Sequence, residues 1–203
     1  VHLTYTDLTT RYYQRRSGSG WSAPKLLGGG FSTPPTGSIS QTASGVVRAV
    51  WGDDLYQGAP IGVGELLPNA GWDRATLDRC PEYGCAHPRL ATDAAGASHL
   101  AFVIAWDDGT LFFHPRLHYA TRSAGGDWSQ SELVENVSAF EVAIATGPDG
   151  PHLAYVDSDN LVLKHATRVN GTWRIEAVRG TCRTTSPPPS RSTTRAGCTW
   201  ATC

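Results

Sequence analysis

An internal repeat constrains the fold of this 203-residue chain more than any other feature of its sequence. The phrase His99–Val103 (HLAFV) returns as His152–Val156 (HLAYV). Leu117–Arg122 (LHYATR) likewise returns as Leu163–Arg168 (LKHATR), and each copy is followed by a glycine-containing turn and a tryptophan. Repeats of roughly 40–50 residues built from short strands are typical of chains in which each repeat forms one small sheet.

The tryptophans extend this pattern over residues 1–178. Trp21, Trp72, Trp128 and Trp173 are separated by 51, 56 and 45 residues, and a strand-like segment follows each of them. Four short antiparallel strands per repeat predict an all-β chain, a β-propeller fragment of about four blades. A β-sandwich is the alternative, because short strands joined by regular turns also describe that fold.

The repeat also predicts where the blades begin and end. Residues 1–29 form a partial blade that starts at its second strand, 39–76 a diverged blade, 88–134 and 139–178 two further blades, and 179–203 an irregular tail. The chain has 22 glycines and 13 prolines, and no segment has the 3.6-residue apolar periodicity of a helix. We therefore expect few helices.

The repeated phrases resemble bacterial β-propeller repeats related to the sialidase, or BNR, superfamily, over most of residues 1–178. In that family an Asp-box, Ser-x-Asp-x-Gly-x-Thr-Trp, links the third and fourth strands of a blade. Thr121, Ser123, Gly125 and Trp128 fall at its positions, with Ser123 in place of the defining aspartate. The boxes are degenerate, and we expect the tryptophans to serve as packing residues that seal hairpin ends.

The resemblance raises a fragment of a sialidase-like glycoside hydrolase as an alternative function. A sialidase site needs three arginines that bind a carboxylate, a Tyr–Glu nucleophile pair and an acidic aspartate. Arg11, His118 and Lys164 are predicted to share one equivalent position in three repeats, so the repeat supplies no arginine triad there. We predict a non-catalytic recognition or scaffold module that binds a glycan or a protein, with no catalytic residue, no cofactor and no metal in this segment.

The loops between the second and third strands are the predicted ligand site, because in propellers they usually emerge on the binding face. Two of them are long and combine aromatic rings with carboxylates, which suits a sugar that stacks on a ring and donates from its hydroxyls. The alternative is that these residues cap strand ends and pack between loops. The candidates are Trp51, Asp53, Asp54, Tyr56, Trp106, Asp107, Asp108 and Arg116.

Histidines and aspartates also recur with the repeat. His2, His99 and His152 share one strand position, which predicts packing or turn bonding rather than catalysis. Asp7 and Asp157 follow the same second strand, where a carboxylate commonly accepts hydrogen bonds from the amides of a turn.

Two cysteines five residues apart, Cys80 and Cys85, predict a small-loop disulfide in an extracellular protein. The alternative is a zinc site that they share with His87, for which the sequence shows no fourth ligand.

Charge and hydropathy exclude further classes of function. Residues 1–178 contain 13 basic and 18 acidic residues, a negative balance that disfavours nucleic acid as a partner. No run of 18 apolar residues exists, so we expect no membrane span.

The chain lacks methionine, is rich in arginine and begins at Val1 inside a strand-like segment. We therefore expect a fragment of a bacterial protein, extracellular or at the cell surface, whose partners include further blades of the same propeller.

Residues 180–203 depart from the repeat where the next first strand should begin. Their Ser/Thr/Pro-rich composition is typical of a linker. A frameshift is the other interpretation, because rereading the codons of Gly197–Cys203 from the third base of each preceding codon permits Val-His-Leu-Gly-Tyr-Val, a second-strand phrase. On that basis we expect a frameshift near Val178–Cys182.

Overall fold

The computed structural model describes residues 1–29, 36–52, 60–67, 71–77, 84–107 and 113–178. The described residues form fifteen β-strands and no helix, which confirms the expectation of an all-β chain. Within these ranges the structure therefore contains no helix with the length and hydropathy needed to cross a membrane.

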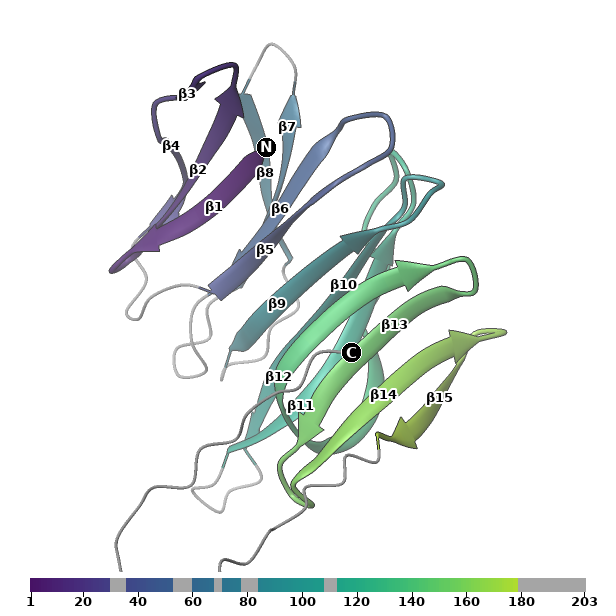
Figure 1. Ribbon diagram of the computed structural model, residues 1–203. Helices are drawn as coiled ribbons and strands as arrows, with labels where there is room; N and C mark the ends of the chain where they lie inside the picture. The colour runs from purple at the N-terminus through teal and green to yellow at the C-terminus, as the bar shows by residue number, and fades with distance from the viewer. Residues whose placement is uncertain (30–35, 53–59, 68–70, 78–83, 108–112, 179–203) are drawn as a thin grey trace, which may run out of the picture.

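The strands form antiparallel units that follow one another along the chain (Figure 1). Unit 1 contains β1 (His2–Asp7), β2 (Thr10–Ser17), β3 (Gly20–Trp21) and β4 (Lys25–Gly29). Unit 2 contains β5 (Thr36–Gln41), β6 (Val47–Gly52), β7 (Ile61–Leu67) and β8 (Gly71–Leu77), in that order across the sheet. In unit 1, β2 pairs with β1 along one edge and with β3 and β4 along the other.

Units 3 and 4 share one long strand. Unit 3 contains β9 (Cys85–Thr92), β10 (Ser98–Asp107), β11 (Phe113–Arg122) and the first half of β12 (Glu132–Gly147). Unit 4 contains the second half of β12, then β13 (Gly150–Asp157), β14 (Val162–Val169) and β15 (Thr172–Ala177). β12 pairs with β11 up to Ser138 and with β13 from Ala139 onward, so the expected junction between the last two repeats lies inside a continuous strand.

The first strands of successive units lie side by side. β5, β9 and the second half of β12 contact one another in this order. The Leu90 amide donates to Ser38 Oγ at 2.6 Å, and Thr146 Oγ1 donates to the Thr92 carbonyl at 3.0 Å. Single side-chain bonds of this kind connect neighbouring sheets along one side without merging them into one ladder.

The core consists of three apolar clusters, each between two successive units. Tyr13 of unit 1 packs with Trp51 of unit 2 in the first cluster, and Ile61 with Phe102 joins units 2 and 3 in the second. In the third, Tyr119 of unit 3 lies with Tyr155 of unit 4. Each sheet is therefore stabilised mainly by its neighbours rather than by a core of its own.

The repeated tryptophans have the packing role predicted for them. Trp72 meets Tyr13 of the preceding unit edge to face, with ring centroids 5.0 Å apart and planes at 79°. Trp173 meets Tyr119 in the same way, at 5.0 Å and 77°. Such aromatic pairs contribute roughly 0.5–1.5 kcal/mol beyond the area they bury. Trp21, in unit 1, is 45% exposed.

The strand register corrects one predicted equivalence. Tyr12, not Arg11, is the structural equivalent of His118 and Lys164. Tyr12 pairs across the strands with Tyr5, and Tyr5 corresponds to the residues that pair with His118 and Lys164. Arg11 and His118 each precede a tryptophan by ten residues, but the turn before Trp128 is one residue longer than the turns before Trp21 and Trp173. The predicted position for Arg11 was therefore wrong by one residue.

Trp51 is fixed in the core by two glycines on the adjacent strand β7. An added Cβ at Gly62 would lie 2.2 Å from the Trp51 indole, and one at Gly64 would lie 3.1 Å from it. The indole therefore lies flat against the backbone of β7. Its side chain is 5% exposed.

This contact predicts a graded response to adding one methyl group. Gly62→Ala should lower the free energy of unfolding by about 2 kcal/mol or more, because overpacking of a filled site typically costs ~1–3 kcal/mol. Gly64→Ala should cost less, and Gly20→Ala, which has no atom within 4 Å of its Cβ position, should change stability little. Urea denaturation of the three variants measures this order, and equal effects at the three positions would contradict the packing of Trp51.

A half-buried histidine predicts a pH dependence of stability. His118 packs against Phe102, with ring centroids 6.0 Å apart. Burial, with a smaller contribution from the Arg116 charge, lowers the pKa of His118 to about 4. Below its ordinary pKa of 6.5 the unfolded chain binds a proton that the folded chain does not accept until about pH 4.

The contribution of neutral His118 to the free energy of unfolding is therefore complete above about pH 6.5, and it is lost as the pH falls from there to about 4. In His118→Gln the free energy of unfolding should fall less over this range, by up to about 1.4 kcal/mol per pH unit, the value for one proton. Urea titrations at pH 7, 6, 5 and 4.5 compare the slopes, and parallel curves would contradict this origin of the acid sensitivity.

Candidate functional site

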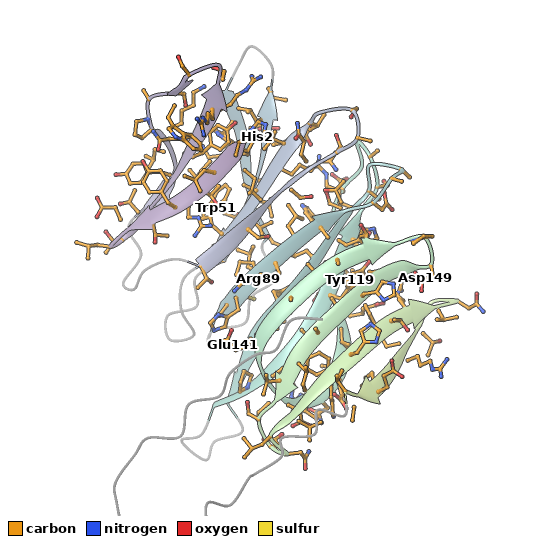
Figure 2. All side chains as sticks on the ribbon, in the orientation of Figure 1. His2, Trp51, Arg89, Tyr119, Glu141 and Asp149 are labelled. Atoms are coloured by element: carbon orange, nitrogen blue, oxygen red, sulfur yellow. The ribbon has the colours of Figure 1, made fainter. Side chains whose placement is uncertain are left out.

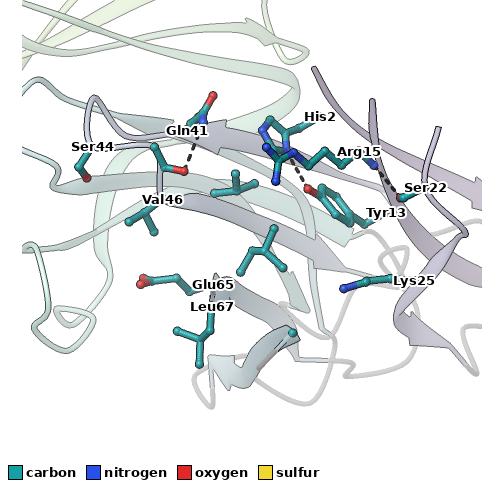
Figure 3. Close-up of a pocket in the computed structure, with 14 residues that line it drawn as sticks. His2, Tyr13, Arg15, Ser22, Lys25, Gln41, Ser44, Val46, Glu65 and Leu67 are labelled. Carbon is teal, nitrogen blue, oxygen red and sulfur yellow. Dashed lines mark hydrogen bonds between the residues drawn. The ribbon is translucent and has the colours of Figure 1, made fainter. Parts of the chain in front are cut away.

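A pocket of about 490 Å³ lies between units 1 and 2 (Figure 3). It opens where β5 turns into β6 and β7 turns into β8. Both units contribute polar side chains, and unit 2 also contributes apolar ones. The lining residues are His2, Tyr13, Arg15, Ser22, Lys25, Gln41, Ser44, Gly45, Val46, Val47, Glu65, Leu66, Leu67 and Gly71.

His2 and Tyr13 form a hydrogen-bonded pair on the unit 1 wall. The distance between His2 Nδ1 and the Tyr13 hydroxyl is 2.7 Å, and the rings stack with centroids 5.9 Å apart. Burial, together with the charges of the amino terminus and Arg15, lowers the pKa of His2. Burial raises the pKa of Tyr13, so both side chains are neutral near pH 7.

The β5–β6 turn of unit 2 is held by its own side chains. Thr42 Oγ1 accepts from the Val46 amide at 2.9 Å and bonds to Ser44 Oγ at 2.8 Å. Gln41 Nε2 donates to the Gly45 carbonyl at 3.2 Å, and Gly45 has φ +88°, a conformation that favours glycine. These bonds fix the upper wall of the pocket before any ligand binds.

Glu65 is the one carboxylate among the described lining residues. Arg48 Nε donates to it at 2.9 Å, and an Arg122 terminal nitrogen lies 3.6 Å away. Arg48 is buried and also donates to the Gly96 carbonyl and to Ser98 Oγ. Glu65 is therefore bound by two arginines and does not balance the cations on the opposite wall.

An ion pair found between the last two units has no counterpart among the described residues at the pocket. In units 3 and 4, Arg168 donates to Glu132 at 2.9 Å and the Trp173 indole donates to the same carboxylate at 2.8 Å. By strand register, the position of Glu132 corresponds to Lys25 in unit 1, and that of Arg168 to Leu66 in unit 2.

The replacement changes both the space and the charge at this interface. Leu66 is shorter than arginine, and Lys25 is a cation where the other interface has its carboxylate. Arg15, also exposed, adds a second cation to the same wall. Among the described residues neither Arg15 nor Lys25 forms an ion pair, so this wall presents two positive charges to the pocket.

The residues predicted from the sequence to bind a ligand lie elsewhere or outside the described residues. Trp51 is buried at the end of β6 away from the pocket, where it packs between units (Figure 2). Trp106 and Asp107 end β10, but their side chains are outside the described part of the structure. Outside the described residues altogether lie Asp53, Asp54, Tyr56 and Asp108.

Arg116 is half-buried on β11, opposite Ile104 of β10. It belongs to the end of the sheets at which second strands connect to third strands, as predicted. The described pocket lies at the other end, where first strands turn into second strands. The structure therefore does not bring Arg116 together with the pocket residues.

The repeated histidines have the bonding role predicted for them. His99 Nδ1 lies 2.5 Å from the Tyr119 hydroxyl, and its Nε2 lies 3.1 Å from Asp93 at the preceding turn. His152 likewise meets Asp149 at 2.8 Å and His165 at 3.2 Å. Each histidine thus connects a turn to the third strand of its own unit.

The prediction for Asp157 is also confirmed. Its Oδ1 accepts from the amides of Asp159 and Asn160, at 3.0 and 3.2 Å. The carboxylate is fully buried and also pairs with Lys164 at 2.8 Å. Although burial opposes ionisation, these bonds lower the pKa of Asp157.

Cys85 is disulfide-bonded and buried. Cys80, its predicted partner, lies outside the described residues. A sulfur in a disulfide is not a thiolate ligand, which argues against the alternative of a zinc site with His87. Among the described residues no group of three or more His, Cys, Asp or Glu side chains is arranged to hold a metal ion.

Sequence reasoning missed the pocket, although one signal for it was present. The histidine at the second strand recurs together with a tyrosine on the third strand, as His2 with Tyr13 and His99 with Tyr119. An alignment of the third strands on this His–Tyr pair places Lys25 opposite Tyr13. In unit 3 the equivalent position is a glutamate, Glu132.

No model of a protein family matches the sequence, and no curated protein is similar to it. Solved structures are similar in fold. A mutant of AofleA from Arthrobotrys oligospora matches with 12% identity and a TM-score of 0.60, over 83% of this chain and 50% of that one. An α-L-arabinanase from Penicillium chrysogenum, complexed with arabinobiose, matches with 12% identity and a TM-score of 0.55, over 85% of this chain and 57% of that one.

The chain thus spans about half the length of these two proteins. At this identity the likeness concerns the fold alone, which in these neighbours is of the β-propeller type.

Proposed function

We propose that this chain is part of a secreted or cell-surface bacterial β-propeller that recognises a glycan without catalysis. In this proposal the four units are propeller blades of BNR type whose Asp-boxes have lost their aspartate. The binding site is the pocket between units 1 and 2.

The composition of that pocket carries the proposal. Hydroxyl, amide and cationic side chains project from two walls around apolar groups such as Val46 and Leu67. Its volume of about 490 Å³ lies within the range of roughly 300–1,000 Å³ typical of small-molecule sites. A sugar presents hydroxyls and C–H groups together, so it matches such a mixture of polar and apolar contacts.

Two further observations bear on the ligand and on catalysis. The similar arabinanase holds arabinobiose, a disaccharide, on a related fold. Most glycoside hydrolases use two carboxyl groups, and the described lining residues include one, Glu65, which Arg48 already binds. A fragment of a glycoside hydrolase is the other candidate, and turnover of a chromogenic glycoside would favour it.

The first test is binding to an array of neutral and acidic oligosaccharides that includes arabinobiose. We expect retention of at least one class, and Arg15→Ala should weaken binding of the retained glycans at least tenfold, because a charged hydrogen bond contributes about 1.5–3 kcal/mol. Arg174→Ala, an exposed arginine of unit 4 that does not line the pocket, is the matched control. An array without any retained glycan, or equal losses in both variants, would count against the proposed site.

The unpaired cations predict a preference for glycans that carry a carboxylate or a sulfate. In the last two units the carboxylate of Glu132 occupies the corresponding position and binds Arg168 and Trp173. The anionic group of the glycan would occupy this position in the pocket. Binding of acidic glycans should weaken as NaCl rises from 50 to 500 mM, and Lys25→Gln should reduce the preference over neutral glycans. The double variant Lys25→Glu/Leu66→Arg rebuilds the missing ion pair and should abolish binding, whereas salt-independent binding would argue for a neutral ligand.

A further inference from the structure

The two ends of the row of units expose side chains whose equivalents are buried between units. On the free face of unit 4, strands β13 and β14 carry His152, Ala154, Val156, Leu163 and His165. By strand register the equivalents in unit 3 are His99, Ala101, Val103, Leu117 and Tyr119. Four of these five pairs are identical in residue type.

The unit 3 residues and their unit 4 equivalents differ in solvent exposure. In unit 3, Ala101, Val103 and Leu117 are 0% exposed because unit 4 covers them. In unit 4 the equivalent Leu163 is 37% exposed. The free face of unit 4 therefore has the residue types of a buried face, but no described residue covers it.

Unit 1 has the complementary face. Leu3, Tyr5 and Trp21 correspond by register to Leu153, Tyr155 and Trp173, the residues with which unit 4 covers unit 3. Leu153 is 0% exposed, whereas Leu3 is 41% exposed and Trp21 45%. Apolar side chains gathered on such a face are typical of an interaction surface.

The charges of the two faces match as well. Between units 3 and 4, Arg168 and the Trp173 indole both donate to Glu132. Arg16 lies opposite Trp21 as Arg168 lies opposite Trp173. Glu176, 62% exposed, lies opposite His165 as Glu132 lies opposite Tyr119.

We propose that the free face of unit 1 packs on the free face of unit 4 of a second copy of this chain. Trp21 then meets His165, and Arg16 pairs with Glu176, which reproduces the interface between units 3 and 4. The contact is head to tail, so two copies can close a ring. The match of charge supports a second copy as the occupant, because Arg16 on one face and Glu176 on the other are placed to repeat the pair that Arg168 forms with Glu132.

The test measures the mass of the 203-residue chain in solution by light scattering after size exclusion. We expect a mass of at least two chains of 21.7 kDa each. Leu3→Glu and Leu163→Glu each remove one of the two faces and should give monomers. Leu8→Glu and Leu161→Glu, exposed leucines at turns, are the matched controls and should keep the assembly.

Mixing distinguishes a head-to-tail contact from a symmetric one. Leu3→Glu retains its unit 4 face and Leu163→Glu retains its unit 1 face, so the two monomeric variants should form a heterodimer when combined. Arg16→Glu and Glu176→Arg should each weaken the assembly, and the double variant should restore it.

A monomeric native chain would overturn the proposal and would assign the two faces to other segments of a longer protein. Loss of the assembly in the turn controls, or a mixture of face variants that stays monomeric, would overturn it too. Glycan binding in the pocket between units 1 and 2 is independent of all these outcomes.

Discussion

The structure depends on the burial of each sheet between its neighbours. Successive residues of a strand point to opposite faces, so a unit with apolar side chains on both faces needs a partner on each side. Leu100 and Ala101 illustrate this, because both are fully buried and they belong to different clusters, one toward unit 2 and one toward unit 4. A single four-stranded unit has no closed core, and the repeat specifies interfaces more than it specifies separate sheets.

Much of this arrangement could be predicted from the sequence, because repetition makes single residues informative. The tryptophans recur with the turn that precedes them, which predicted both their equivalence and their packing role. Asp157 could be predicted for a similar reason, since its partners lie two and three residues away. Local contacts and recurrent contacts are the two kinds that a linear sequence reveals.

What could not be predicted depends on register across strands. Trp51, followed by acidic residues, has the composition of a binding loop, yet its environment is set by Gly62 and Gly64 on the next strand. The same limit applies to Lys25, whose meaning depends on Tyr13 opposite it and on Leu66 in another unit. A change of one residue in turn length was enough to misplace Arg11, and no propensity or composition records that change.

The long strand β12 has a consequence for how the molecule unfolds. Among the described residues no backbone ladder connects unit 1 to unit 2 or unit 2 to unit 3, so these sheets are held against their neighbours by side-chain contacts. Between units 3 and 4 the backbone ladder itself continues across the junction, from Ser138 paired with β11 to Ala139 paired with β13. We therefore expect the last two units to open as one cooperative block, whereas opening of units 1 and 2 would expose the unit 2 side of unit 3 without breaking the ladder of that block.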